Sequence, residues 1–234
     1  TLTDVRQPKP AIPVGTGIKR SGKRLLTVGT DCAVGKMYTV LALEKAMRAR
    51  GMDADFRATG QTGIFIAGNG VPIDAVVADF ISGAAEYIAP ANNAQHWDLI
   101  EGQGSLFHPS YAAVTLGLVH GSQPDMMILC HKAGLVHIDQ HRDYMIPQLS
   151  ECILMYEEAA RLTNRNAAVV GLSFNTSTMV EGAAQDYLSA MEKTYGLPCF
   201  DPVRTGVERM VDYIQDEKQE ARFYKLFPHK QCVS

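Results

Sequence analysis

The chain has 234 residues with 22 basic and 25 acidic side chains, which gives a formal net charge of −3. This balance provides no basic surface for nucleic acid, and no apolar run approaches the ~20 residues that span a bilayer. The five cysteines are scattered and form no CxxC pair, which argues against a disulfide framework or a zinc knuckle. We therefore expect a cytoplasmic protein without nucleic-acid or membrane partners.

The first residues are polar and rich in proline, and the sequence does not begin with Met. Residues 7–13 read QPKPAIP, a composition typical of linkers. We expect residues 1–22 to be a linker from a missing N-terminal domain. Residues 23–234 are then expected to form the α/β domain described next.

Apolar runs alternate with helical periodicity along the rest of the chain. In chain order we expect a strand at 24–29, a helix at 36–50, a strand at 54–59, a Gly-rich stretch at 59–70, a helix at 73–89, a strand at 97–101, a helix at 111–120, a strand at 125–130, a helix at 143–162, a strand at 167–174, a helix at 180–195, a strand at 199–200 and a helix at 204–216. Strands that are apolar throughout indicate a mostly parallel sheet with helices on both faces. Ligands of such sheets bind beyond the carboxyl ends of the strands.

The connection after the first strand resembles a phosphate-binding P-loop, which reads GxxxxGK[ST] between a strand and a helix. Gly35 and Lys36 stand in the expected place, whereas Thr30 occupies the position of the leading glycine. Backbone N–H groups of such a loop face an anion, and the lysine adds a positive charge. We expect a three-layer sandwich like that of the P-loop NTPases. The expected cofactor-binding residues are Gly29, Thr30, Asp31, Cys32, Ala33, Val34, Gly35, Lys36 and Met37.

One residue departs from the P-loop pattern. Met37 follows Lys36 where Ser or Thr normally places a hydroxyl on Mg²⁺. Thr39, two residues further along, is a poor substitute. Met37 therefore argues against conventional Mg-ATP hydrolysis and favours a phosphate-bearing cofactor that needs no metal. Cys32 is either a small filler or a nucleophile, and Asp31 either caps the loop or contacts a ligand.

Polar residues follow the other strands. Glu101 ends the third strand and is either a base or metal ligand, or an ordinary cap. His108 follows closely, as a general base or as a hydrogen-bonded loop histidine. Asp74 and Asp79 on the next predicted helix are either functional or solvated. Further polar loops follow the last strands, at 175–177 and 201–204, where a nucleotide base or ribose or a helix cap is expected.

A histidine-rich segment follows the fourth strand. His131 ends that strand, and His137 and His141 have i,i+4 spacing. A metal pair is conceivable, but no carboxylate motif completes it, so we expect no metal. With Asp139 and Arg142, these histidines are expected to form a polar loop over the site.

Two families share these motifs. The phosphate loop and residues 101–104 (EGQG) resemble the dethiobiotin synthetase group. A longer set of segments resembles the DgcN-like family, long described as a domain of unknown function. These segments are 29–37 (GTDCAVGKM), 58–64 (ATGQTGI), 70–80 (GVPIDAVVADF), 101–106 with His108 and Pro109, 115–123 (TLGLVHGSQ), 129–131 (LCH) and 201–204 (DPVR).

The second resemblance implies a D-glutamate N-acetyltransferase that uses acetyl-CoA in D-amino-acid catabolism. It also implies an N-terminal Rossmann-like domain, without which this chain could be inactive, and a homo-oligomer. The phosphates of coenzyme A need no catalytic metal. The expected catalytic residues are Glu101, His108 and Lys36, and the expected substrate-binding residues are Thr59, Gln61, Thr62, Gln103, Ser105, His131, Lys132 and Arg142. The alternatives are an ATP-dependent ligase or kinase that uses Mg²⁺, and a non-catalytic nucleotide-sensing module.

Overall fold

A six-stranded parallel sheet forms the centre of the computed structural model, which describes residues 11–216. The strand order is β2-β3-β1-β4-β7-β8. The bounds are β1 Lys23–Gly29, β2 Ala54–Arg57, β3 Trp97–Ile100, β4 Met126–Lys132, β7 Ala168–Asn175 and β8 Cys199–Phe200. Because β1 lies between β3 and β4, the chain changes direction there, and the carboxyl ends of these strands border one crevice.

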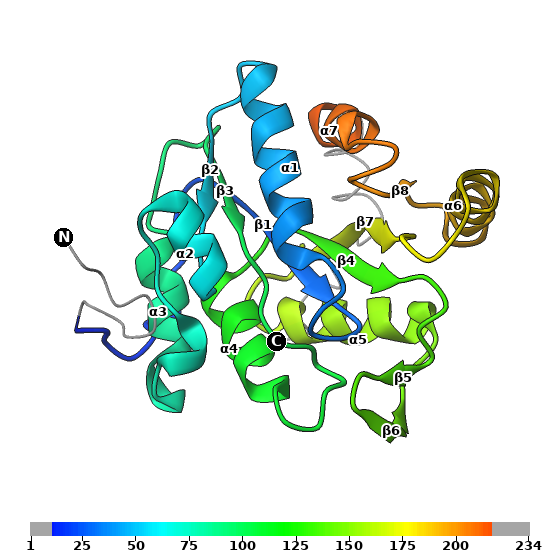
Figure 1. The fold of residues 1–234 in the computed structure, drawn as a ribbon. Coiled ribbons are helices and arrows are strands. Elements are labelled where there is room, and N and C mark those ends of the chain that lie inside the picture. Colours follow the sequence, from blue (N-terminus) through cyan, green and yellow to red (C-terminus); the bar gives the residue numbers. More distant parts are fainter. Residues whose placement is uncertain (1–10, 217–234) are drawn as a thin grey trace, which may run out of the picture.

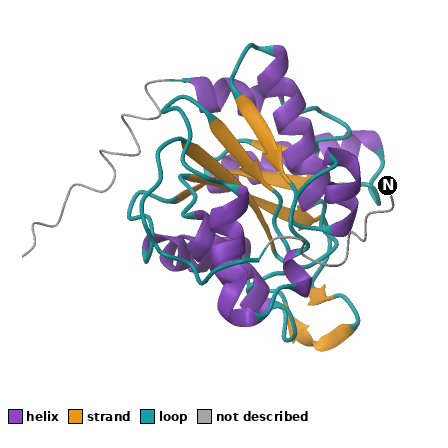
Figure 2. Ribbon diagram, turned by 90° about the vertical axis from the view of Figure 1, so that its left-hand side faces the viewer, coloured by secondary structure: helices purple, strands orange, loops and turns teal. Residues whose placement is uncertain are grey.

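Helices cover both faces of the sheet, as expected (Figures 1 and 2). One face carries α1 (Lys36–Ala49) and α7 (Glu208–Gln215), and the other carries α3 (Ile81–Ile88), α4 (Ala112–Ser122), α5 (Leu149–Arg161) and α6 (Glu181–Tyr195). Successive strand residues alternate between the two cores: Leu25 packs with α1, and Leu26 with α3 and α4. This alternation explains why the strands are apolar throughout.

The predicted helix at 143–162 is wrong over its first residues. An antiparallel hairpin, β5 (His137–Ile138) and β6 (His141–Met145), occupies part of that range, and α5 begins only at Leu149. Pro147 cannot donate a backbone hydrogen bond to a helix. Gln148 caps α5 in a reciprocal capping box with Glu151, which fixes where the helix starts.

The region between β2 and β3 also differs from the prediction. The Gly-rich stretch contains a short helix, α2 (Gln61–Ala67), which ends at Gly68 in the left-handed conformation. The predicted helix at 73–89 is interrupted, because Val76 and Val77 are extended between two 3₁₀ turns (73–75 and 78–80), and α3 starts at Ile81. At the other end of the chain, α7 starts after a turn at Gly206 rather than at residue 204.

Residues 11–22 lie along α3 and α4. Arg20 donates hydrogen bonds to the carbonyl oxygens of Ala89 (2.7 Å) and Gly121 (2.5 Å). The carboxylate of Glu86 on α3 accepts backbone N–H groups of Thr16 and Gly17. Whether a further domain precedes this segment stays a prediction. Residues 1–10 of the predicted linker and Cys232 lie outside the described residues.

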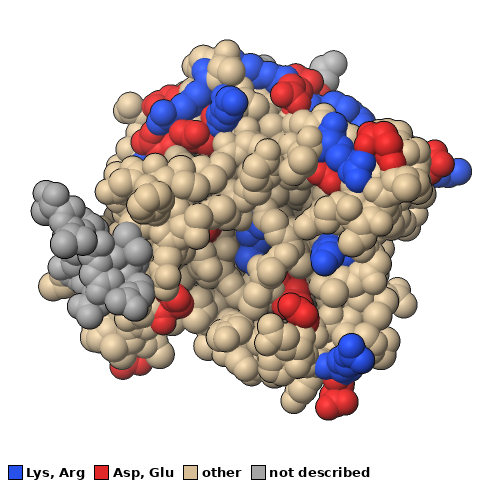
Figure 3. Space-filling model, viewed as in Figure 1, with Lys and Arg blue, Asp and Glu red and all other residues tan. Residues whose placement is uncertain are grey.

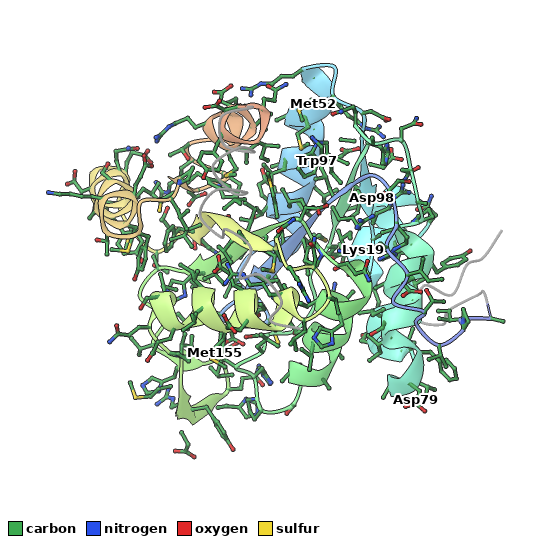
Figure 4. All side chains as sticks on the ribbon, turned by 180° about the vertical axis from the view of Figure 1, so that it is seen from behind. Lys19, Met52, Asp79, Trp97, Asp98 and Met155 are labelled. Atoms are coloured by element: carbon green, nitrogen blue, oxygen red, sulfur yellow. The ribbon has the colours of Figure 1, made fainter. Side chains whose placement is uncertain are left out.

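Two acidic side chains that were expected to be either functional or solvated lie at the surface. Asp74 and Asp79 are exposed, and Figure 4 shows Asp79 at the edge of the molecule, whereas Asp98 on β3 is fully buried. None of the helices between residues 11 and 216 combines the length and the apolarity needed to cross a bilayer.

We predict that Gly102→Ala destabilises the fold by about 1–3 kcal/mol, because the added methyl group overpacks the junction of β1 and β3. A Cβ at residue 102 would lie 1.7 Å from the carbonyl oxygen of Thr27. Urea unfolding measures the change. Gly182→Ala is the matched control: this residue lies in α6 with open space around it, so alanine should stabilise the protein by about 0.5–1 kcal/mol. Equal stability of Gly102→Ala and wild type would contradict the prediction.

Candidate active site

The phosphate loop (residues 29–37) joins β1 to α1 and carries a buried lysine. Lys36 is 5% exposed, and its ammonium group donates hydrogen bonds to the carbonyl oxygens of Asp31 and Cys32, both at 2.7 Å. Burial lowers the pKa of Lys36, and the nearby cysteines and acidic groups oppose that shift. Gly35 has a φ of 104°, and no side chain caps the first N–H groups of α1. These amides and Lys36 together fit a phosphate group.

Two contacts hold the loop in place. The hydroxyl of Thr30 pairs with Nδ1 of His131 at 2.8 Å, and burial lowers the pKa of His131 to about 4. The carboxylate of Asp31 accepts the N–H groups of Cys32 (2.6 Å) and Asp139 (2.7 Å). Asp139 lies in the turn between β5 and β6. The hairpin is thus tied to the phosphate loop, in line with the predicted polar loop over the site.

Thr39 does not replace the hydroxyl that Met37 lacks. It is fully buried, and its hydroxyl donates to the carbonyl oxygen of Gly35 (3.0 Å) and pairs with Ser173 (2.8 Å). The structure therefore agrees with the sequence argument that this loop offers no hydroxyl ligand to Mg²⁺ at the usual place.

Glu101 directly follows β3 and is 3% exposed. One of its oxygens accepts the N–H groups of Thr59 and Gly60, each at 2.9 Å. Burial raises the pKa of Glu101, while these hydrogen bonds, the Gln103 side chain and the charge of Lys36 oppose the rise. A Cβ on Gly63 would lie 2.3 Å from the carboxylate, so glycine is needed at the start of α2 for the two elements to meet.

His108 is 5% exposed and lies at the mouth of the phosphate loop. Its Nδ1 accepts the backbone N–H of Ser110 at 3.1 Å, and its ring packs on that of Tyr111. Potential ligand atoms of His108, Asp31 and Cys32 lie within 4.8 Å of one another. Burial lowers the pKa of His108, with Asp31 opposing the change. Burial likewise raises the pKa of the Cys32 thiol.

The expected substrate-binding residues do not all join one hydrogen-bond network, and His131 pairs with Thr30 as described above. Thr59 and Gln103 join Glu101: the Thr59 hydroxyl donates to the Glu101 carbonyl oxygen at 2.7 Å. Ser105 is buried in its own turn, where its hydroxyl accepts the N–H of Phe107. Within residues 11–216, no hydrogen bond connects the following side chains to Glu101 or Lys36: Gln61, Thr62, Lys132 and Arg142. In the view of Figure 3, Lys or Arg atoms lie recessed near the middle of the molecule.

A cavity of about 400 Å³ opens beside the phosphate loop. It is lined from the loop and α1 by Val34, Gly35, Tyr38 and Thr39, and from the late loops by Ser173, Phe174, Asn175, Ser177, Asp201, Pro202, Val203 and Arg204. Asp201 shapes its wall by accepting hydrogen bonds from Thr176, Val203 and Arg204. Burial alone would raise the pKa of Asp201, but these bonds hold it below the ordinary value. The loops at 175–177 and 201–204 therefore meet at one wall of this cavity.

Tyr156 is a site residue that sequence reasoning missed. This fully buried side chain of α5 donates to the carbonyl oxygen of Gly29 (2.7 Å) and accepts the N–H of Leu106 (3.2 Å). It joins the phosphate loop to the segment that carries His108. A tyrosine on the apolar face of a helix normally indicates core packing, so the sequence held no signal for this contact.

Comparisons with known proteins place the chain in a family. Two curated relatives named D-glutamate N-acetyltransferase, from Tritonibacter scottomollicae and a Pseudoalteromonas species, are 53% and 52% identical over 91% and 90% of this chain. They are matched over 64% and 63% of their own length. The chain thus spans slightly less than two thirds of these relatives.

Solved structures agree with this placement. A crystal structure of a DUF1611 family protein from Anabaena variabilis is 40% identical, with a TM-score of 0.85 over 92% of this chain and 64% of that one. Cobyrinic acid a,c-diamide synthase from Mycobacterium smegmatis, solved with ADP and magnesium, is 15% identical with a TM-score of 0.52, over 87% of this chain and 96% of that one. The second likeness concerns the fold alone and confirms the expected fold class.

A family model described as "Domain of unknown function (DUF1611_C) P-loop domain" matches residues 13–211. This match covers most of the chain and includes the phosphate loop, Glu101 and His108. The protein therefore belongs to the DUF1611 family, whose P-loop domain it contains.

Proposed function

We propose that this chain carries the acetyl-CoA site of an N-acetyltransferase that acetylates the amino group of D-glutamate or a related D-amino acid. The curated relatives, which are named D-glutamate N-acetyltransferase, support this activity. The observation that carries the proposal is a phosphate loop in which Lys36 is buried and Met37 replaces the usual Mg²⁺ ligand. Such a loop suits a phosphate-bearing substrate that needs no metal.

Acetyl-CoA would bind along the phosphate loop and the adjoining cavity. The uncapped N–H groups of α1 and the Lys36 ammonium would hold phosphate oxygens. The 400 Å³ cavity between α1 and the late loops has room for an aromatic base between Tyr38 and Val203. Both features lie at the carboxyl ends of β1 and β7, where ligands of parallel sheets bind.

Glu101 supplies the base that the reaction needs. The substrate arrives as an ammonium ion and must lose a proton before its nitrogen can attack the thioester carbon. Attack forms the C–N bond, and collapse of the tetrahedral oxyanion breaks the C–S bond. The products are the N-acetylated amino acid, coenzyme A thiol and one released proton. Burial raises the pKa of Glu101, which makes its carboxylate a better proton acceptor than an exposed glutamate.

Basic side chains near the site are candidates for the two substrate carboxylates. Lys132 is half-buried at the end of β4, and Arg142 is exposed on β6 of the hairpin. Either could pair with a carboxylate. The proposal includes an N-terminal Rossmann-like domain, because the curated relatives are longer than this chain and leave room for one. It also includes a cytoplasmic location and a homo-oligomer.

We predict that Lys36→Ala weakens acetyl-CoA binding at least tenfold, because the loop loses its buried cation and the two hydrogen bonds that this cation donates to the loop carbonyl oxygens. Titration calorimetry with acetyl-CoA, CoA, ADP and Mg-ATP measures this change and ranks the ligands. Lys45→Ala, which removes an exposed charge from the same helix, is the matched control and should bind normally. Tight binding of Mg-ATP with no binding of CoA compounds would instead favour the ligase or the sensing module.

We predict that Glu101→Gln lowers kcat for acetyl transfer about 10²–10⁴-fold, since an amide cannot accept the proton. In the wild type, activity should fall as the pH drops through the raised pKa of Glu101, because a base works only when it is deprotonated. Thiol release from acetyl-CoA with D-glutamate, followed across pH in the full-length protein, gives both results. Asp79→Asn, at an exposed position, serves as the control. An acid limb that persists in Glu101→Gln would assign the base to another residue.

We predict that Met37→Thr creates no Mg-dependent ADP release, because the rest of the site is arranged for acyl transfer. The variant restores the hydroxyl that P-loop ATPases place on Mg²⁺. Coupled detection of ADP with Mg-ATP and candidate carboxylates tests this. A gain of ATP turnover would support the ATP-dependent alternative.

A further inference from the structure

We propose that His108 is a neutral hydrogen-bond donor that holds an acceptor oxygen of the bound acetyl thioester through its Nε2–H. This assignment departs from the expectation that His108 is a general base. The part that concerns catalysis rests on the proposed function. The part that concerns the protonation of the ring rests on hydrogen-bond geometry alone.

The backbone of Ser110 fixes the tautomer of His108. An amide N–H can only donate, and that of Ser110 points at Nδ1 at a distance of 3.1 Å. Nδ1 must therefore carry the lone pair. In a neutral imidazole the other nitrogen then carries the proton, so Nε2 is a donor. No lone pair remains at Nε2 to take a proton from a substrate amine or from the Cys32 thiol.

The surroundings keep the ring neutral and oriented. His108 is 5% exposed, and burial lowers its pKa together with the nearby charges of His141 and Lys36, against the opposing effect of Asp31. The ring of Tyr111 lies 4.4 Å away at a tilt of 31°, and that of His141 lies 4.9 Å away edge-on. These two aromatic neighbours and the hydrogen bond from Ser110 restrict rotation of the ring, so Nε2–H has a defined direction.

Nε2 has no hydrogen-bond partner among residues 11–216. Its ring nevertheless lies in a cluster with Asp31 and Cys32 at the phosphate loop. The Asp31 oxygens already accept two backbone N–H groups, and no hydrogen bond joins them to the ring. An N–H without a protein partner beside the phosphate loop is well placed for an acceptor oxygen of a ligand bound there.

The same tautomer weakens the two other readings of this cluster. Asp31, Cys32 and His108 are close enough to hold a metal ion, but a histidine ligand must offer a lone pair and usually donates its other N–H to an acceptor. Here the lone pair faces Ser110. A cysteine nucleophile would likewise need a base beside it. His108 and Glu101 therefore have different roles. Glu101 accepts the proton, and His108 stabilises the developing oxyanion.

Nitrogen NMR of the ring tests the tautomer without any assay of activity. The protein is labelled with ¹⁵N-histidine, and the His108 signals are identified by their absence from His108→Gln. We expect a pyridine-type Nδ1 and a pyrrole-type Nε2 at pH 7, unchanged by added Zn²⁺. A proton on Nδ1, a charged ring at pH 7, or a shift of these signals on zinc binding would overturn the proposal.

Kinetics of two variants test the catalytic role. His108→Ala should lower kcat about 10²–10³-fold, as the loss of one oxyanion donor does. His108→Gln keeps an N–H near the position of Nε2 and should recover at least tenfold of that loss, with the acid limb of the pH profile unchanged. The control is His120→Gln on α4, whose ring contacts the Ala159 carbonyl oxygen, and it should match wild type.

The outcomes separate the alternatives. If His108→Gln is as inactive as His108→Ala and the acid limb disappears, His108 is the base and the proposal fails. If both variants bind CoA more weakly but keep kcat, the acceptor is a phosphate oxygen, which overturns the assignment to the thioester. If the wild type transfers no acetyl group, the proposed function fails. The NMR experiment still decides the tautomer of His108, because it does not depend on activity.

Discussion

A buried ammonium group at Lys36 is the constraint around which the strand ends are arranged. A charge that leaves water must be compensated, and here two carbonyl oxygens of its own loop accept hydrogen bonds from it. The charge of Glu101 on the neighbouring strand adds to this compensation. Glu101 is buried in turn and needs the N–H groups of Thr59 and Gly60. The ends of β1, β2 and β3 are thus linked by hydrogen bonds and by the attraction between the charges of Lys36 and Glu101.

Close approach of backbone segments makes these contacts of Lys36 and Glu101 possible. Gly102 lets β3 pass the carbonyl oxygen of Thr27, and Gly63 lets α2 reach the carboxylate of Glu101. Any side chain at these positions would separate the acid from the phosphate loop. Both glycines lie where a neighbouring group would clash with a Cβ atom.

The fold was largely predictable because its signals are local. Each strand is an apolar run, and Gly35-Lys36 marks the junction of β1 with α1. The hairpin at 137–145 was not predictable, since its polar residues alternate too weakly to indicate strands, and the boundary depends on the cap at Gln148. The roles of Tyr156 and Ser110 were also beyond sequence reasoning. Tyr156 acts through hydrogen bonds to two segments distant in sequence, and Ser110 acts through its backbone N–H. Neither role is visible in the residue type.

The hydrogen bond between Asp139 and Asp31 gives the hairpin an energetic link to the phosphate loop. A bond of this charge-assisted kind contributes about 1.5–3 kcal/mol. An open form, in which the hairpin is lifted away from the phosphate loop, breaks this bond. Its population is therefore roughly tenfold to a hundredfold lower than it would be without the bond. A ligand or a change of protonation that removes the Asp31 carboxylate from this bond changes the free energy of hairpin opening. By linkage, opening of the hairpin changes the free energy of that event by the same amount. The conformations of the phosphate loop and of the hairpin are therefore coupled.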